Sequence, residues 1–417
     1  MSAPKSHING IFFGLTIAYF AAFQQFKLPV VLPEMLNLYG YDLTLAGGFM
    51  SIYAAVGLVL SLALGKAIER RGPIGLLYGA MVLFVVGNAL ALWRPESGMV
   101  VLLSRGLEGI AFSVLAIAGP VLANRNASPK ALPLIIGLTA TWIPVGQISA
   151  TLLAPLALLH FDWRFLWWIS IAGAVGLLLW TVCLRWRQPI LLKAGTAKLE
   201  KSEAKTSPPA IDAEVTTYQK RALILGGAVF MLWSCQYFAY MTWLPEYLVD
   251  QHGLELTSAL VGYLIPVVFV GLFCVLTGTL LRIGLALRWL LIVGLAGQVG
   301  CWLLLPFTNS ASLGVFSLVL YGVSGGIVPT CLFALPSAIV GQGVSVARAF
   351  ALVLTGRNIG VLAGPVLLAE AFKYFGGWGL AVPIFGGITA VAFCLALILA
   401  FRFDFAGFRG LLSSSRL

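Results

Sequence analysis

Long apolar runs dominate the sequence and restrict its fold more than any other feature. A helix of about 20 apolar residues crosses the roughly 30 Å hydrocarbon core of a bilayer. The 417 residues are 60% hydrophobic and only 10% charged, whereas soluble domains carry about 25% charged residues. The sequence therefore predicts an all-α membrane protein with twelve transmembrane helices. These spans are expected at 11–33, 44–65, 74–93, 99–123, 133–158, 165–184, 221–248, 258–281, 286–306, 311–339, 347–371 and 379–402.

One long polar segment divides the spans into six and six. It covers 185–220, has mixed charge, and is rich in Ala, Ser, Thr and Pro, which is typical of a solvated linker. We therefore predict an N-terminal six-helix bundle over 1–184, a cytoplasmic linker over 185–220 and a C-terminal six-helix bundle over 221–417.

The distribution of basic residues indicates the orientation in the membrane. If the N-terminus is cytoplasmic, the outer loops hold only Arg94, Arg164 and Lys373, and this bias is typical of the positive-inside rule. We expect both termini in the cytoplasm, in a bacterial inner membrane, with the chain as a monomer. The net charge of +11 forms no basic stripe interleaved with aromatic residues, so we expect no nucleic-acid partner.

The two halves repeat each other. Gln24 and the tripeptide 32–34 (Leu-Pro-Glu) recur 212 positions later, at Gln236 and 244–246. A ladder of small residues that begins at Gly146 recurs 210 positions later in the eleventh span, which indicates a duplicated six-helix unit. Its members there are Gly356, Gly360, Gly364 and Pro365. Small residues at every fourth position let helices approach closely. Static packing and a sliding hinge between the halves both remain open.

The sequence offers little for enzyme chemistry. The six cysteines stand singly in apolar segments, without a CxxC pair, and the three histidines lie at the terminus or in loops. We therefore expect no disulfide framework, no metal site and no cofactor. Nucleophile–base pairs and phosphate-binding glycine loops are also absent from the loops, so we expect no enzyme.

Four ionisable residues lie well inside spans: Lys27, Arg105, Glu108 and Arg357. Charges in hydrocarbon are costly and indicate function by default. Each also has a structural alternative. Lys27 is within snorkelling distance of the interface. Arg105 and Glu108, three residues apart, can neutralise each other. For Arg357, bonding to free carbonyls or between the halves is an alternative to contact with a substrate.

Several motifs resemble those of the major facilitator superfamily. The loop "GKAIERRG" is similar to its hallmark G-x-x-x-[D/E]-R-x-G, and "SRGLEG" and "FDWRF" are similar to two further elements. Span one and the glycine ladders weakly resemble small-anion porters of the cyanate and nitrate type. The resemblance implies a transporter with two six-helix bundles, with spans one, four, seven and ten around a central cavity. It also implies a gating loop at Gly65, Glu69, Arg70 and Gly72.

Three intramembrane cations against one carboxylate favour a small anionic substrate. Glu108 is the candidate for proton coupling, because it is the only carboxylate near the midplane. Efflux of lipophilic compounds is an alternative, suggested by the aromatic residues of span seven, and a membrane sensor without transport is another. The residues that we expect to bind substrate are Gln24, Lys27, Arg105, Gln236, Tyr240 and Arg357.

Overall fold

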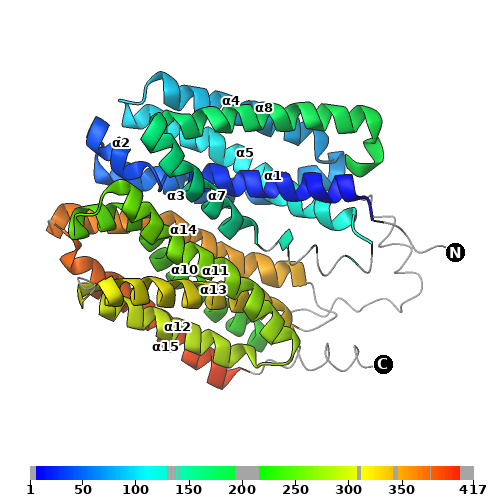
Figure 1. The fold of residues 1–417 in the computed structure, drawn as a ribbon. Coiled ribbons are helices and arrows are strands. Elements are labelled where there is room, and N and C mark those ends of the chain that lie inside the picture. The colour runs from blue at the N-terminus through cyan, green and yellow to red at the C-terminus, as the bar shows by residue number, and fades with distance from the viewer. Residues whose placement is uncertain are drawn as a thin grey trace. The chain divides into compact units, whose positions relative to one another are not determined.

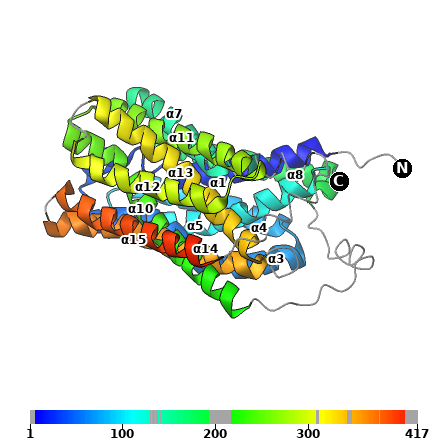
Figure 2. The same cartoon turned by 90° about the horizontal axis from the view of Figure 1, so that it is seen from below.

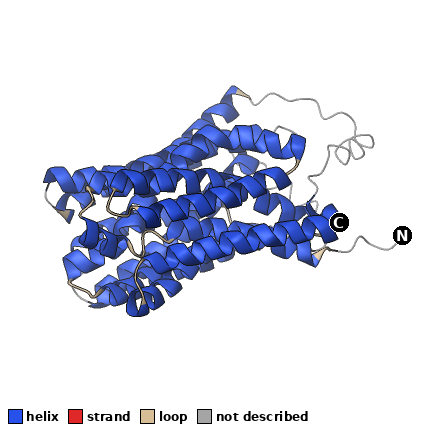
Figure 3. Ribbon diagram, turned by 90° about the horizontal axis from the view of Figure 1, so that it is seen from above, coloured by secondary structure: helices blue, strands red, loops and turns tan. Residues whose placement is uncertain are grey.

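A computed structural model describes residues 6–128, 131, 135, 138–139, 141–192, 216–307, 311–340, 346–375 and 377–403. Helices are the only regular secondary structure within these ranges (Figure 3). The short 3-10 helices are η1 (Pro189–Leu192), η2 (Leu305–Phe307) and η3 (Trp378–Leu380). The α-helices are α1 (Ile8–Phe26), α2 (Leu32–Tyr39), α3 (Leu43–Arg71), α4 (Ile74–Trp93), α5 (Gly98–Arg125), α7 (Trp142–His160), α8 (Arg164–Arg187), α10 (Thr217–His252), α11 (Leu256–Arg282), α12 (Leu287–Leu304), α13 (Ala311–Val340), α14 (Val346–Phe375) and α15 (Ala381–Arg402).

Eleven of the described helices are long and apolar enough to cross a membrane. The remaining expected span corresponds to α1, whose polar residues Asn9, Gln24 and Gln25 lower its hydropathy. Each predicted span thus has one long helix, in the expected order. The all-helical, twelve-span prediction is confirmed.

The chain divides into two compact units (Figure 1). The first holds Met1–Thr206 with Glu255–Leu260, and the second holds Ser207–Leu254 with Val261–Leu417. We call α1 to α8 the N-terminal bundle and α10 to α15 the C-terminal bundle. The division between residues 206 and 207 falls within the predicted linker, of which 193–215 lie outside the described residues.

In the N-terminal bundle, α5 packs against α1, α3 and α4, while α8 packs on α4 and α7 on α1. Glycines permit the closest of these approaches. A side chain at Gly119 of α5 would lie 2.9 Å from both Ala18 and the carbonyl oxygen of Gly14 on α1. Because neither backbone can move aside cheaply, these small residues hold α1 and α5 together.

In the C-terminal bundle, α10 packs against α14 and α15, and α12 packs against α13 and α15 (Figure 2). The helix α11 lies against α13, where side chains at Gly322 or Gly326 would meet its backbone. Thus glycine-mediated backbone contacts recur in this bundle.

The predicted glycine ladders pack within each bundle. Gly146 of α7 lies against Ala22 and Phe23 of α1, and the Pro365 carbonyl accepts a 3.0 Å hydrogen bond from Trp243 Nε1. The α14 glycines lie against the backbone of α10, with Gly356 at Gly227, Gly360 at Met231 and Gly364 at Cys235. These contacts are those of close packing inside a bundle. A sliding hinge remains a hypothesis.

The first predicted span, 11–33, is interrupted. The helix α1 ends at Phe26, residues 27–31 form turns, and α2 begins at Leu32. Pro29 accounts for the break, because its ring clashes with the preceding turn and it has no N–H for the helical ladder. The corresponding helix of the second half, α10, runs through 36 residues without a break.

Candidate functional site

Three of the predicted intramembrane charges meet inside the N-terminal bundle. Glu108 accepts hydrogen bonds from Lys27 Nζ at 3.2 Å and from Arg105 Nη1 at 2.6 Å. None of these three side chains has solvent-exposed surface. The predicted neutralisation of Arg105 by Glu108 is therefore present, and Lys27 joins the same cluster.

Lys27 follows the last residue of α1 and points into the bundle. Its Nζ donates to Gln24 Oε1 at 2.7 Å and to Ser170 Oγ of α8 at 3.2 Å, and it also bonds Asn88 Oδ1 of α4. The ring of Trp167 lies 4.6 Å from the same nitrogen. A snorkelling lysine would place its head in water. The snorkelling alternative is therefore wrong for this conformation, in which the Lys27 side chain has no solvent-exposed surface.

Arg105 of α5 binds backbone as well as Glu108. Its Nη1 and Nη2 donate to the carbonyl oxygens of Gln24 and Gln25, each at 2.9 Å, in the last turn of α1. Its Nε donates to the carbonyl of Phe49 on α3 at 3.2 Å. Every nitrogen of the guanidinium group therefore has an acceptor.

The cluster carries an excess of one positive charge, because two cations share one carboxylate. Tyr53 of α3 donates to Glu108 Oε2 at 2.7 Å, so the carboxylate already accepts from three groups. Two buried N–H groups beside Lys27 have no hydrogen-bond partner among the described residues. They are Nε2 of Gln24 and Nε1 of Trp167. An excess of cations and of free donors suits an anion.

The C-terminal bundle has an uncharged polar centre built on Gln236 of α10. Its Oε1 accepts from Trp302 Nε1 and from Tyr321 hydroxyl, each at 3.0 Å, and its Nε2 donates to Gln298 Oε1. Tyr240 stacks on Tyr321 with ring centroids 3.7 Å apart. This centre offers hydrogen bonds and aromatic faces rather than charge.

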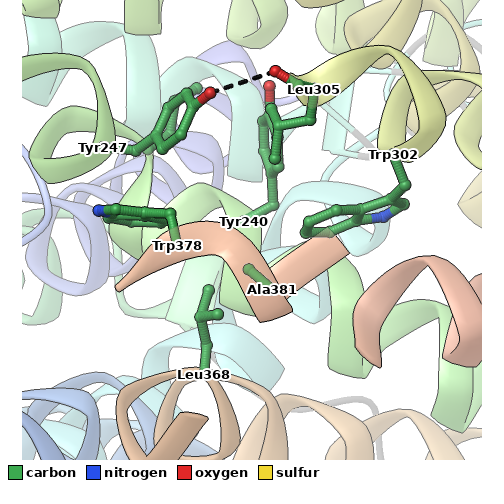
Figure 4. Close-up of a pocket in the computed structure, with 8 residues that line it drawn as sticks. Tyr240, Tyr247, Trp302, Leu305, Leu368, Trp378 and Ala381 are labelled. Atoms are coloured by element: carbon green, nitrogen blue, oxygen red, sulfur yellow. Dashed lines mark hydrogen bonds between the residues drawn. The ribbon is translucent and has the colours of Figure 1, made fainter. Parts of the chain in front are cut away.

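A small pocket opens beside this centre (Figure 4). The figure shows the rings of Tyr240 and Trp302 on the walls of the pocket. The pocket has room for about one water molecule. The lining is mainly aromatic and aliphatic: Tyr240, Leu244, Tyr247, Trp302, Leu305, Leu368, Trp378 and Ala381.

Arg357 lies on α14, in the C-terminal bundle. Its Nη1 donates to Asn358 Oδ1 at 3.0 Å, and its guanidinium carbon lies 5.6 Å from the ring centre of Phe238. Within the part of the chain that the structure describes, it has no ion pair. The expected substrate residues thus fall into two groups, Gln24, Lys27 and Arg105 in one bundle and Gln236, Tyr240 and Arg357 in the other.

The predicted gating loop follows α3. Gly72 ends this helix with a φ of 78°, a conformation that favours glycine, and its N–H donates to Ile68 oxygen at 2.9 Å. The side chains of Glu69 and Arg70, and the surroundings of Gly65, lie outside the described residues. Across the described residues, no cluster of His, Cys, Asp and Glu side chains is suited to a metal ion.

The sequence reasoning missed several partners of the predicted residues. The internal repeat contains a signal for two of them, because the pair Gly87-Asn88 recurs 210 positions later as Gly297-Gln298. Each of these amides binds the glutamine of its own bundle's first helix. The other missed residues had no such signal: Tyr53, Trp167, Ser170, Trp302 and Tyr321.

The family model of the Major Facilitator Superfamily matches residues 11–346. The chain belongs to this superfamily. The resemblance of its motifs predicted this, and the match extends from α1 to the start of α14.

Curated relatives match about half of the chain at low identity. A hexuronate transporter of Bacillus subtilis (strain 168) is 28% identical over 248 residues, 55% of each chain. A putative metabolite transport protein of Haemophilus influenzae (strain ATCC 51907 / DSM 11121 / KW20 / Rd) is 25% identical over 248 residues, 55% of this chain and 57% of the relative. The chain thus spans about half the length of the curated relatives it matches.

Solved structures share the fold at low identity. A POT family transporter in complex with 5-aminolevulinic acid has a TM-score of 0.75 at 13% identity, covering 94% of this chain and 95% of that one. The peptide transporter POT in complex with sulfate has a TM-score of 0.72 at 16% identity, covering 94% and 93%. At these identities the likeness concerns the fold alone.

Proposed function

We propose that this protein is a secondary active transporter that moves a small anion across the membrane by alternating access. We place it in a bacterial inner membrane, as a monomer with both termini in the cytoplasm. Membership of the Major Facilitator Superfamily supports transport, and the chemistry of the buried side chains supports an anion.

The observation that carries the proposal is the excess positive charge of the N-terminal bundle. Lys27 and Arg105 share the single carboxylate of Glu108, and all three are fully buried. A buried cation that lacks a full counter-charge costs free energy, and an anionic ligand removes that cost.

The hexuronate transporter among the relatives suggests the class of anion. A hexuronate is a sugar that bears one carboxylate. We propose a small hydroxylated carboxylate as substrate, with its carboxylate at Lys27 and the unpaired donors beside it.

Glu108 supplies a route to proton coupling. An anion that binds Lys27 competes with Glu108 for the same cation. Uptake of a proton by Glu108 ends this competition, so proton and anion bind together. Glu108→Gln, which keeps a carbonyl acceptor, should retain exchange of substrate between the two sides while losing acceleration by an imposed pH gradient. A gradient response equal to that of wild type would contradict this role.

A thermal-stability screen of the purified protein tests the anion proposal. The ligands are matched pairs that differ only in the carboxylate, such as glucuronate with glucose and galacturonate with galactose, together with nitrate, cyanate, sulfate and small monocarboxylates. At 100 times its dissociation constant, a ligand stabilises by about 2.7 kcal/mol. We expect one or more anions, and no neutral partner, to raise the melting temperature.

The variants localise the effect. Lys27→Ala should abolish the shift, whereas Lys220→Ala, which removes one exposed charge at the start of α10, should preserve it. An equal shift in Lys27→Ala, or stabilisation by the neutral sugar alone, would overturn the proposal.

Efflux of lipophilic compounds is the second candidate, favoured by the aromatic pocket at Tyr240 and Trp302 (Figure 4). It predicts that lipophilic cations stabilise the protein and that Lys27→Ala responds as wild type does. Tyr240→Ala would then abolish the response. The same screen therefore separates the two functions.

A further inference from the structure

We propose that Arg105 supplies the hydrogen bonds that Pro29 removes from α1, and thereby stabilises the helix break that directly follows Lys27 and fixes the acceptors of Lys27. Arg105 is then a positioning residue rather than a substrate ligand. The inference rests on the proposed function for the role of Lys27, but its test of stability is independent of any substrate.

The chemistry of the break identifies the groups that need a partner. In a continuous helix the N–H of residue 29 would donate to the carbonyl of Gln25, four residues earlier. Proline has no N–H, so the Gln25 carbonyl loses its helical donor inside the membrane, where water is absent. Arg105 Nη2 donates to this oxygen at 2.9 Å.

The neighbouring carbonyl is satisfied in the same way. Gln24 oxygen, in the last turn of α1, accepts from Arg105 Nη1 at 2.9 Å and from the Tyr53 hydroxyl at 3.2 Å. The last carbonyls of a helix carry partial negative charge, so a cation at this end is favourable. One guanidinium group therefore caps the C-terminal end of α1 from a neighbouring helix.

The C-terminal bundle provides an internal control for this pairing. Adding the 212 positions of the first repeat to Pro29 leads to Met241, which has an N–H, and α10 continues through it. Adding 213 positions to Arg105 leads to Leu318, which has no donor on its side chain. The proline and the arginine are thus present together in one bundle and absent together from the other.

Packing supports the equivalence of Arg105 and Leu318. A side chain at Gly109 of α5 would meet residues 53 and 56 of α3, and one at Gly322 of α13 would meet residues 266 and 269 of α11. Residues 322, 266 and 269 each lie 213 positions after residues 109, 53 and 56, respectively. The two helix pairs therefore cross at the same points, so the comparison of Arg105 with Leu318 is structural.

Lys27 lies directly before the break. This residue is the first after α1, and its head bonds Gln24, Asn88, Glu108 and Ser170. The backbone at Lys27 is still helical, with a φ of −63°, a ψ of −28° and a 2.9 Å hydrogen bond from its N–H to the Phe23 oxygen. Arg105 Nη1 donates to Glu108 Oε2 and to the Gln24 carbonyl, and the side chains of Glu108 and Gln24 accept from Lys27 Nζ. Arg105 thus acts on the anion through the position of Lys27.

Four proteins test the pairing: wild type, Arg105→Leu, Pro29→Met and the double variant, which copies the residues of the C-terminal bundle. The melting temperature of each is measured in detergent without ligand. Arg105→Leu should lower it by several degrees in the wild-type background and by less than half as much beside Pro29→Met. If Arg105→Leu alone yields no folded protein, recovery of folded protein in the double variant is the expected result.

A control variant and an uptake measurement complete the test. Glu108→Gln, made in both backgrounds, should cost the same in each, because Glu108 bonds neither of the two carbonyls. The double variant should be stable but at least tenfold weaker in anion uptake, since it lacks the guanidinium group that holds Gln24 and Glu108 beside Lys27. An equal cost of Arg105→Leu in both backgrounds, or full uptake by the double variant, would overturn the proposal.

Discussion

The two bundles share a plan but differ at their centres. Gln24 and Gln236 occupy equivalent positions, and each bonds an amide side chain, Asn88 or Gln298, on a neighbouring helix. Around this shared pair the N-terminal bundle adds Lys27 and a carboxylate, whereas the C-terminal bundle has aromatic rings. One duplicated framework therefore holds two different chemistries.

Position by position, the difference is small in sequence. Lys27 is replaced by Ala239, 212 positions on, and Glu108 by Tyr321, 213 positions on. Tyr321 donates to Gln236, while Glu108 accepts from Lys27. At these equivalent positions only the N-terminal bundle carries charged side chains, and the following predictions measure what those charges do.

The largest effect is expected from Glu108→Leu. It leaves Lys27 and Arg105 as buried cations without a carboxylate, and breaking such a pair costs about 3–5 kcal/mol. The matched change, Tyr321→Leu, removes one neutral hydrogen bond and some ring packing, so it should cost less. Denaturant unfolding in detergent measures the free energy of unfolding of both variants. Equal losses would show that the charged centre contributes no more to stability than the neutral one.

The next effect concerns helix packing. In Gly360→Ala the new methyl group would lie 2.8 Å from the backbone nitrogen of Cys235, so α10 and α14 must separate. Overpacking of this kind costs about 1–3 kcal/mol.

Gly278→Ala is the control, because a methyl group there meets nothing within 4 Å. It should be neutral or slightly stabilising in the helix. A lower melting temperature for Gly278→Ala than for Gly360→Ala would contradict the packing account.

A smaller difference separates the equivalent amides. Asn88→Leu removes an acceptor of the Lys27 cation, and Gln298→Leu removes an acceptor of the neutral Gln236. Hydrogen bonds to charged groups contribute about 1.5–3 kcal/mol and neutral ones about 0.5–1.5 kcal/mol. Asn88→Leu should therefore lower the free energy of unfolding more than Gln298→Leu does. A larger loss for Gln298→Leu than for Asn88→Leu would contradict the view that the N-terminal centre depends more on charged hydrogen bonds.

The smallest effect is expected at Glu34, beyond the end of the first span. Burial, and then the charge of Asp162, raise the pKa of Glu34 above 4.5. The folded protein then holds this proton more tightly than the unfolded chain, so the stabilisation is present at low pH and is lost as pH rises through the raised pKa. Glutamine does not titrate, so Glu34→Gln removes this loss of stability at high pH.

Melting curves at pH 4 and pH 8 measure the effect. The gain of Glu34→Gln over wild type should be larger at pH 8, and below about 1 kcal/mol because solvent screens this partly exposed side chain. A larger gain at pH 4 would contradict the sign.

Much of the fold was predictable because hydropathy and internal repetition are properties of the sequence itself. The twelve spans and the pairing of Arg105 with Glu108 follow from runs of residues and from helical spacing. The break at Pro29 was missed, since proline is tolerated inside many membrane helices, including α10 at Pro245. Only the freed carbonyls and their partner Arg105 show that this proline ends the helix.

Partners on distant helices were the least predictable part. Ser170 and Trp167 reach Lys27 from α8, and no local pattern indicates which face of that helix is turned inward. The packing register also departs from the sequence repeat. Gly146 repeats as Gly356, yet by its contacts with α1 it corresponds to Gly364, which lies against Cys235 of α10.

Uptake into proteoliposomes tests the central claim most directly, with the anion that gives the largest thermal shift. Wild type, Lys27→Ala, Lys27→Arg and Lys220→Ala are compared at equal amounts of folded protein. A lost charged hydrogen bond of about 1.5–3 kcal/mol corresponds to a fall of roughly 10- to 150-fold in uptake for Lys27→Ala. We expect partial activity for Lys27→Arg and full activity for Lys220→Ala. Undiminished anion uptake by Lys27→Ala would contradict the account.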